Sequence, residues 1–272
     1  MKVYFDNAAT TKVRDEVIDE ISLVLKNCFG NPSSTHSFGR SAKSYIETSR
    51  KSISKILNCE PGEIIFNSGG TESDNSILKC AVKDLGVKHI ISSKIEHHAI
   101  THTLEELESQ DISIHYVKLK NNGQVDLKNL EELLASINEP KLVTLMYINN
   151  EIGNILDVKS VSELCQKYNS FFHSDAVQAV GHYSLDLKSL KIDFLSSAGH
   201  KFHGPKGVGF TYINKSTKIK SFICGGPQER GLRAGTESVH NIVGMTKALE
   251  ISEKKMKQES HYVRSVSYTH LR

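Results

Sequence analysis

The chain has 272 residues, of which 38% are hydrophobic and 24% are charged, and its formal net charge is +3. These values suit one large or two modest globular domains, and they exclude the strongly basic surface of a nucleic-acid-binding protein. The chain also lacks both an apolar run of membrane-helix length and a signal-peptide core at its start, so we expect a cytoplasmic protein with no membrane or nucleic-acid partner.

The chain begins with a short extended stretch at 1–12. Apolar residues at helical spacing then predict two helices, over 14–28 and 39–57, separated by a helix-breaking turn at 30–34. Beyond them, strand and helix patterns alternate. The expected strands cover 64–66, 89–91, 112–117, 142–148, 171–174, 192–196 and 208–213. The expected helices cover 71–85, 98–109, 126–137, 157–168 and, after a loop to about 235, 237–257. Such alternation predicts a mainly parallel sheet covered on both faces, with ligands at the carboxyl ends of its strands.

Lys201 is the first candidate catalytic residue. It follows the apolar run 194–198 directly and opens a loop rich in glycine and proline. Burial at such a place lowers the pKa of a lysine and makes its amine a better nucleophile, as Schiff-base chemistry with a carbonyl cofactor requires. Taken alone, this position fits an ordinary surface lysine better, so the rest of the chain must decide.

Two stretches have the composition of anion sites. Residues 67–73 place two glycines and Thr71 between a strand and a helix, where free N–H groups can bind a phosphate. Residues 225–237 combine glycines with two arginines ahead of the last helix. A capped helix in the first case, and a mobile surface loop in the second, explain the same patterns.

Three more polar residues follow expected strands. Asp175 can hydrogen-bond a pyridinium nitrogen, and His97 can stack on a flat cofactor or carry a proton. Asn150 can donate to a cofactor oxygen or a substrate carboxylate. A helix cap, a solvated histidine and a turn asparagine are the respective alternatives. Asp175 and Lys201 end successive strands, so both can face one pocket.

The cysteines and histidines do not predict a metal site. The five cysteines, at positions 28, 59, 80, 165 and 224, are odd in number and form no CxxC pair, which excludes a disulfide framework or a zinc ribbon. Cys28, Cys80 and Cys165 fit small buried hydrophobic positions. His97 and His98 are adjacent, and we find no histidine pair four residues apart on a clear helix, so no metal is expected.

In their order, these pieces resemble the cysteine desulfurases of the NifS/IscS type, within the class V aminotransferases of pyridoxal 5'-phosphate (PLP) fold type I. The matching stretches are 4–11 (YFDNAATT), 30–34 (GNPSS), 68–73 (SGGTES), 96–99 (EHHA), 149–153 (NNEIG), 175–178 (DAVQ), 199–201 (GHK) and 229–236 (ERGLRAGT). The resemblance extends from residue 2 to about 258. It implies a three-layer αβα fold with a mainly parallel central sheet.

The resemblance also implies roles for single residues. Lys201 matches the lysine that binds PLP covalently, and His97 matches a histidine that stacks on the ring and takes part in proton transfer. The remaining matches concern cofactor contacts. They are Asp175 for the ring nitrogen, Gln178 for the ring hydroxyl, Asn150 near the ring and the substrate carboxylate, Gly70, Thr71 and His200 for the phosphate, and Thr236 for the phosphate of the other subunit.

The implied reaction converts L-cysteine to L-alanine and leaves the sulfur as an enzyme persulfide for iron–sulfur cluster or thio-cofactor assembly. It implies a homodimer and a sulfur acceptor such as an iron–sulfur scaffold protein. Two departures from the family stand out. Ala198 replaces a serine that bonds the phosphate in many relatives, a loss of about 0.5–1.5 kcal/mol. The family's catalytic cysteine also has no counterpart among the five cysteines.

The resemblance therefore predicts three regions: residues 1–13 as part of a small domain, 14–257 as the large PLP-binding domain, and 258–272 as an aberrant or truncated tail. Most of the small domain would be missing, which would leave Ile242, Val243, Met245 and Leu249 partly exposed. Another class V PLP enzyme, such as a selenocysteine lyase, and an inactive PLP-binding fragment remain the alternatives. We expect negligible sulfide release from this chain alone.

Overall fold

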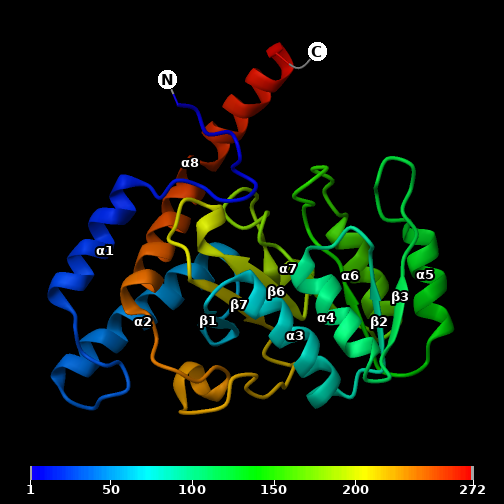
Figure 1. Cartoon of the computed structure of the whole chain (residues 1–272), viewed down its shortest axis with the longest axis horizontal. Helices are drawn as coiled ribbons and strands as arrows, with labels where there is room; N and C mark the ends of the chain where they lie inside the picture. The colour runs from blue at the N-terminus through cyan, green and yellow to red at the C-terminus, as the bar shows by residue number, and fades with distance from the viewer. Residues whose placement is uncertain (1, 271–272) are drawn as a thin grey trace.

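A computed structural model describes residues 2–270, and its centre is a seven-stranded sheet with helices on both faces (Figure 1). The strand order is β1-β7-β6-β5-β4-β2-β3. Only β7 runs antiparallel to its neighbours, and the other pairs are parallel. The strands are β1 (Ile64–Asn67), β2 (His89–Ser92), β3 (Ser113–Tyr116), β4 (Lys141–Thr144), β5 (Phe171–Asp175), β6 (Phe194–Ala198) and β7 (Gly209–Ile213). The expected three-layer fold with a mainly parallel sheet is confirmed.

Most helices lie within two residues of their expected bounds. The helices are α1 (Asp15–Asn27), α2 (Ser37–Leu57), α3 (Gly70–Leu85), α4 (His98–Glu108), α5 (Leu127–Ser136), α6 (Val158–Lys167), α7 (Leu187–Leu190) and α8 (Val239–His270). The short α7 was not expected, nor were the 3-10 segments η1 (Pro61–Glu63), η2 (Gly199–Lys201) and η3 (Gln228–Gly231). No helix within residues 2–270 is both long and apolar enough to cross a bilayer.

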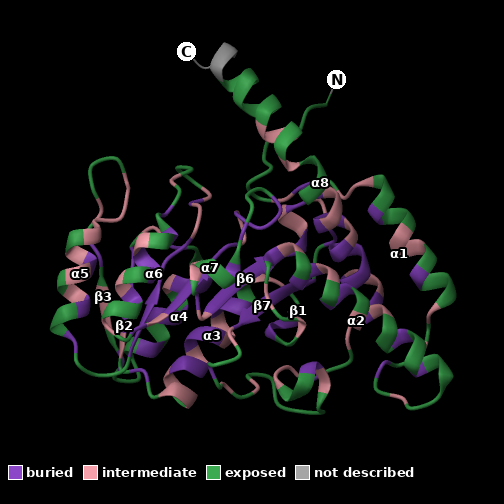
Figure 2. Ribbon diagram, turned by 180° about the vertical axis from the view of Figure 1, so that it is seen from behind, coloured by how far each residue is buried: buried purple, intermediate pink, exposed green. Residues whose placement is uncertain are grey.

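The two faces of the sheet pack into separate cores because neighbouring strand residues point to opposite sides. Ile65, Ile90 and Leu142 pack with residues of α3 and α4. Their neighbours Phe66, Ile91 and Val143 pack with residues of α1, α2, α5, α6 and α8. Figure 2 shows the buried sheet between these layers. Helix α3 therefore lies over one face, with its first turn at the carboxyl ends of the strands.

The expected strand over 142–148 is too long, since β4 ends at Thr144. The N–H groups of Leu145 and Tyr147 still donate to carbonyls of β5. On the other side, however, the N–H of Met146 donates to the Glu96 carboxylate (2.8 Å) instead of to a strand. The ladder on that side therefore stops at the site where the polar residues gather.

Helix α8 differs from the sequence-based expectation in two ways. It continues to His270 instead of ending at 257, since no glycine or proline interrupts 246–270, and Arg14 pairs with Glu259 at 2.8 Å. Residues 271–272 of the expected tail lie outside the described residues. Secondly, the four apolar residues that we expected to be exposed, Ile242, Val243, Met245 and Leu249, are all buried. They belong to the core that α8 shares with α1, α2 and the sheet, while residues 261–267 of α8 are exposed (Figure 2).

Candidate active site

A cavity of about 450 Å³ lies where the carboxyl ends of β5 and β6 meet the start of α3. It brings together the residues that the sequence proposes for the site, although they are spread from residue 70 to residue 201 of the chain. These residues are Gly70, Thr71, His97, Asn150, Asp175, Gln178, His200 and Lys201. Thr236 is the exception, because it does not line this cavity and is exposed on the loop before α8.

Lys201 lies half-buried in η2, directly after β6. Its ammonium donates to the carbonyl oxygens of Ala8 and Ala9, the latter at 3.0 Å. Burial lowers the pKa of Lys201, and the charges of Asp175 and Asp6 oppose this effect only in part. The amine therefore loses its proton more easily than that of a surface lysine, as a nucleophile requires.

Asp175 ends β5 and is buried at the base of the cavity. It accepts a hydrogen bond from the N–H of Val177 at 2.9 Å. Burial raises the pKa of Asp175 above its ordinary value, and this hydrogen bond and the charges of His97 and Lys201 offset the rise only in part. Nearby, the Gln178 side chain donates to the carbonyl of Ala8 (2.9 Å).

The start of α3 is open to an anion. Its N-cap, Gly69, has no side-chain cap and a φ of 144°, a conformation that L side chains rarely adopt. A Cβ at position 70 would lie 2.7 Å from Val177 Cγ2, so glycine keeps this turn close to the sheet. His200 lies beside it, and burial, with help from Lys201 and Lys206, lowers its pKa. This end of the cavity offers N–H groups and the positive end of a helix.

His97 and Asn150 line the cavity from two loops. His97 is the N-cap of α4, and its Nδ1 accepts from the N–H of Ala99 (3.1 Å), which fixes the side chain. Asn150 donates to Glu151 (2.6 Å). Its neighbour Asn149 is buried, and Asn149 Oδ1 accepts from the N–H groups of Glu151 and Ile152, so Asn149 shapes the turn that carries Asn150.

The N-terminal segment is a part of the site that we did not predict from the sequence. The carbonyls of Ala8 and Ala9 hold Lys201, and Asp6 also lines the cavity. Thr11 fastens this segment, because its hydroxyl donates to the carbonyl of His200 (2.8 Å) and accepts from the N–H of His203 (2.7 Å). Backbone carbonyls leave no signature in a sequence, so only the distinctive composition of 4–11 could have indicated this contact.

Glu96 is a second residue that the sequence did not single out. Its buried carboxyl accepts from the Ser93 hydroxyl (2.6 Å) and the Met146 N–H (2.8 Å). Burial, the largest influence, raises the pKa of Glu96 to about 8, and the charge of Asp175 adds to this rise. Glu96 therefore joins the segment after β2 to the segment after β4 as a neutral acid at pH 7.

We expect Glu96→Gln to weaken the pH dependence of stability. Between the unfolded pKa near 4.3 and the folded pKa, the folded protein holds a proton that unfolding releases, so rising pH destabilises the wild type. From about pH 6 to pH 7, the wild type should lose on the order of 1 kcal/mol relative to Glu96→Gln. Urea unfolding at both pH values measures this difference.

Glu72→Gln is the matched control. Burial alone would raise the pKa of Glu72, but hydrogen bonds from Arg233 and Ser68 bring it below its ordinary value. Glu72 is therefore ionised in both states above about pH 6, and its replacement should shift stability equally at both pH values. A parallel pH dependence for wild type and Glu96→Gln would contradict a protonated Glu96.

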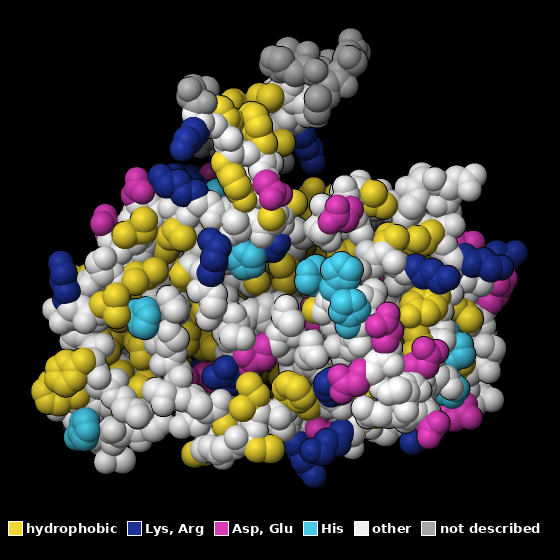
Figure 3. Space-filling model, viewed as in Figure 1, with side chains coloured by type: hydrophobic (Ala, Val, Ile, Leu, Met, Phe, Trp, Pro, Cys, Tyr) yellow, Lys and Arg dark blue, Asp and Glu magenta, His cyan; other side chains and the backbone are white. Residues whose placement is uncertain are grey.

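Histidines gather near the mouth of the cavity, over α4 (Figure 3). His98 and His102 stand four residues apart on α4 with ring centroids 5.1 Å apart, so our statement that no such helical pair exists is wrong. The His97 ring is 6.1 Å from that of His98. Over the part of the chain that the structure describes, no three His, Cys, Asp or Glu residues form a metal-holding group.

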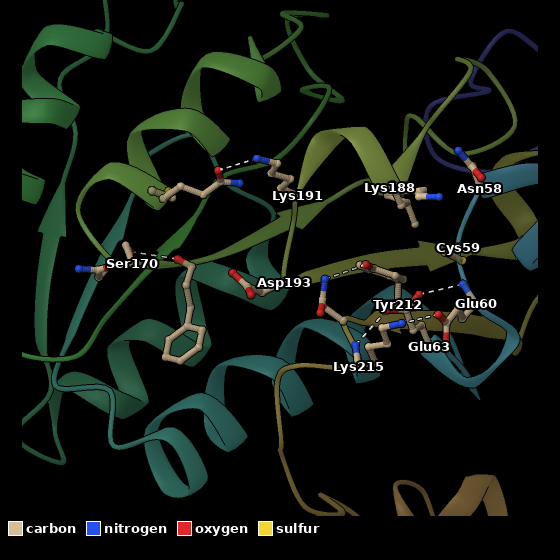
Figure 4. A pocket seen from close by; sticks show the side chains of 16 residues that line it. Asn58, Cys59, Glu60, Glu63, Ser170, Lys188, Lys191, Asp193, Tyr212 and Lys215 are labelled. Carbon is tan, nitrogen blue, oxygen red and sulfur yellow. Dashed lines mark hydrogen bonds and ion pairs between the residues drawn. The ribbon is translucent and has the colours of Figure 1, made fainter.

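A larger cavity of about 790 Å³ lies at the opposite edge of the sheet, near the amino ends of β1, β5 and β6 (Figure 4). Its inner carboxylates are bound to backbone: Glu63 accepts from the N–H groups of Glu60 and Lys215, and Asp193 accepts from that of Phe172. Burial raises the pKa of Cys59 to about 12. The polar groups of this larger cavity thus stabilise the end of the sheet, whereas the candidate catalytic residues line the smaller cavity.

The residues of the smaller cavity fit PLP group by group. An amine of lowered pKa matches the aldehyde, a buried carboxyl matches the pyridine nitrogen, and an uncapped helix start matches the phosphate. The volume falls in the range of small-molecule sites. Together, the sheet order and this donor set define a PLP-dependent protein of fold type I.

Comparison with known proteins supports this assignment. The sequence profile described as aminotransferase class-V matches residues 3–271, beyond the limit near 258 that we expected for the resemblance. The chain belongs to the aminotransferase class V family. It is 45% identical over 262 residues to the cysteine desulfurase IscS of Clostridium botulinum strain Kyoto, covering 95% of this chain and 65% of that relative. Identity to the Dictyoglomus turgidum IscS is also 45%, with 95% and 66% covered.

Solved structures give the same result. A structure titled NifS-like protein superposes with a TM-score of 0.91 at 41% identity, covering 95% of this chain and 71% of that one. Another, titled SspA in complex with cysteine, has a TM-score of 0.87 at 34% identity, with 92% and 72% covered. The chain thus spans about 65% of the length of the curated relatives it matches.

Proposed function

We propose that the protein is a PLP-dependent cysteine desulfurase, which converts L-cysteine to L-alanine and passes the sulfur to a thiol as a persulfide. The observation that carries this proposal is the convergence of Lys201, Asp175, Gln178, His97 and the start of α3 on one cavity. Relatives that share about 45% of the sequence are named cysteine desulfurases, which supports this choice among class V enzymes.

Each side chain has a task in this proposal. When bound, PLP supplies an electron sink that stabilises negative charge on the substrate. Lys201 holds the cofactor covalently, and Asp175 keeps its ring nitrogen protonated. Gln178 donates to the ring hydroxyl, and His97 covers the ring and carries a proton. A separate set binds the phosphate: Gly70, Thr71 and His200.

Asn150 and Lys201 would serve the substrate. Asn150 lies at the mouth, where its amide can reach a substrate carboxylate, and the freed amine of Lys201 can carry a proton to or from the substrate carbon. In the overall exchange, the carbon–sulfur bond of cysteine breaks and a sulfur–sulfur bond forms with a thiol. A proton replaces the sulfur on carbon, which gives alanine.

The accepting thiol would come from outside this cavity. Among the described residues that line it, none is a cysteine. Burial raises the pKa of Cys165, as it does that of Cys59 and Cys80, so these thiols are poor nucleophiles at pH 7. We therefore expect negligible sulfide release from this chain alone.

Further proposals concern the assembly. Thr236, exposed on the loop before α8, would contact the phosphate in a second copy, which makes the functional unit a homodimer. Residues 14–257 would form the cofactor-binding domain, and 1–13 together with the chain from 258 would belong to a smaller domain. The sulfur would reach an iron–sulfur scaffold protein in the cytoplasm, a compartment that suits five free cysteines.

A spectroscopic titration tests the substrate. L-Cysteine added to the PLP-loaded protein should change the visible spectrum of the cofactor in a saturable way, and Asn150→Ala should raise the half-saturating concentration about tenfold through loss of one hydrogen bond to a charged group. A loaded protein that does not respond to L-cysteine would overturn the assignment. A stronger response to L-selenocysteine would favour a selenocysteine lyase. Sulfide assays on the same samples check the expected absence of turnover.

A further inference from the structure

A layer of buried polar side chains lies beneath the cavity, on the sheet face that α3 covers. Thr144, His173 and Ser196 come from the adjacent strands β4, β5 and β6, and Asp175 is two residues after His173 on the same face. Asp74 reaches this layer from the second turn of α3 and also lines the cavity. Polar groups at such depth need hydrogen-bond partners.

Asp74 lacks a full set of partners. Its side chain is 2% exposed, and its Oδ1 has no hydrogen-bond partner. His173 Nε2 lies 3.6 Å from Oδ1, which is beyond hydrogen-bonding distance. An ionised carboxylate with an unsatisfied buried oxygen is very costly, whereas the neutral acid is far less costly to bury.

His173 lies beside Asp74 but brings it no compensating charge. It is fully buried, with Nδ1 2.9 Å from the Thr144 hydroxyl and Nε2 3.0 Å from the Ser196 hydroxyl. Burial lowers the pKa of His173 to about 3, so its ring is neutral at pH 7 and supplies no positive charge to Asp74.

Three buried carboxyls share this region: Asp74, Glu96 and Asp175. Their negative charges repel one another, so they cannot all be ionised in a medium of low dielectric constant. The positive groups that face them, Lys201 and His97, both act on Asp175. On Asp74, burial and the charges of Asp175 and Glu96 favour the neutral acid, and only a hydrogen bond with Ser196 opposes it.

We propose that Asp74 is a positioning residue that stays protonated beneath the site, so that Asp175 alone carries the negative charge that faces the cofactor ring. The role of Asp175 rests on the proposed function, whereas the protonation of Asp74 does not. An ionised Asp74 would repel the charge on Asp175 and draw a proton onto it. Asp175 would then fail to hold the ring nitrogen in its protonated form.

Infrared spectroscopy of the protein without PLP tests the protonation directly. A neutral carboxylic acid has a carbonyl-stretch band that ionised carboxylates lack. At pH 7, Asp74→Asn should remove one such band from the wild-type spectrum, and Glu96→Gln should remove another. Asp175→Asn should leave the Asp74 band in place. An Asp74→Asn spectrum identical to that of the wild type would overturn the proposal, whether or not PLP binds.

PLP affinity, measured on the visible band, tests the consequence for Asp175. Asp74→Ala should weaken PLP binding about tenfold, because the buried layer loses a hydrogen-bonding side chain and relaxes. Asp74→Asn should recover most of this loss, since a neutral amide can donate in place of a neutral acid. An Asn variant that binds as weakly as Ala would show that a charge is required and contradict the proposal. A wild type that binds no PLP would instead refute the proposed function and leave the infrared result standing.

Discussion

Lys201→Ala is expected to lose the visible absorption band that forms when the wild type is incubated with PLP. The amine of Lys201 lies in the cavity with a lowered pKa, and it is the group placed to bind the aldehyde covalently. The start of α3 and His200 remain in the variant, so PLP should still bind loosely through its phosphate and wash out on dialysis. Absorption spectra before and after borohydride reduction and dialysis measure the retained cofactor.

Lys206→Ala is the matched control, because Lys206 is exposed on the same loop and does not line the cavity. It should retain the band at wild-type intensity. Circular dichroism of all three proteins separates a lost amine from a lost fold. A folded Lys201→Ala protein that keeps a borohydride-reducible band would show that another amine binds the cofactor, and the assignment of this site would then be wrong.

The sequence could predict that the site residues lie together, because the parallel topology of the sheet places them at one edge. His97, Asp175 and Lys201 each follow a strand, and the carboxyl ends of parallel strands meet at one edge of a sheet. Chain order and an alternating pattern were therefore enough to place them together. Thr236 differs because its expected role involves a second copy, and no pattern within one chain positions one copy against another.

Other features depend on contacts that no local pattern encodes. Asp74 occupies a helix between other polar residues, and only the packing of α3 on the sheet makes it a buried acid. Ala8 and Ala9 accept the hydrogen bonds of Lys201 through backbone carbonyl oxygens, which every residue has. We expected Leu249 to be exposed because the resemblance implied a second domain over α8, but the core that α8 shares with α1, α2 and the sheet already buries it.

The pairing of Arg50 and Glu229 is a further contact of this kind, since 179 residues separate them. Arg50 in α2 donates two hydrogen bonds of 2.8 Å to the Glu229 carboxylate, and the two side chains are 2% and 1% exposed. Arg50 also donates to the carbonyl of Ile64, and Glu229 accepts from the N–H of Phe66. The pair thus ties α2 and β1 to the loop that carries Thr236.

We expect Arg50→Met and Glu229→Gln each to lower the free energy of unfolding by about 3–5 kcal/mol, because each leaves a buried charge without its partner. The double variant Arg50→Met/Glu229→Gln should lose clearly less than the sum of the single losses, since no unpaired charge remains. Chemical denaturation of the four proteins gives the coupling energy.

The exposed pair of Lys79 and Glu106, with N–O distances of 2.7 and 2.8 Å, is the control. Water screens these charges, so the same cycle there should give at most about 1 kcal/mol. Equal coupling energies at the two sites would contradict the argument from burial. A large coupling at Arg50 and Glu229, with Thr236→Ala leaving stability unchanged, would show that the pair fixes the loop while its tip stays free to contact a second copy.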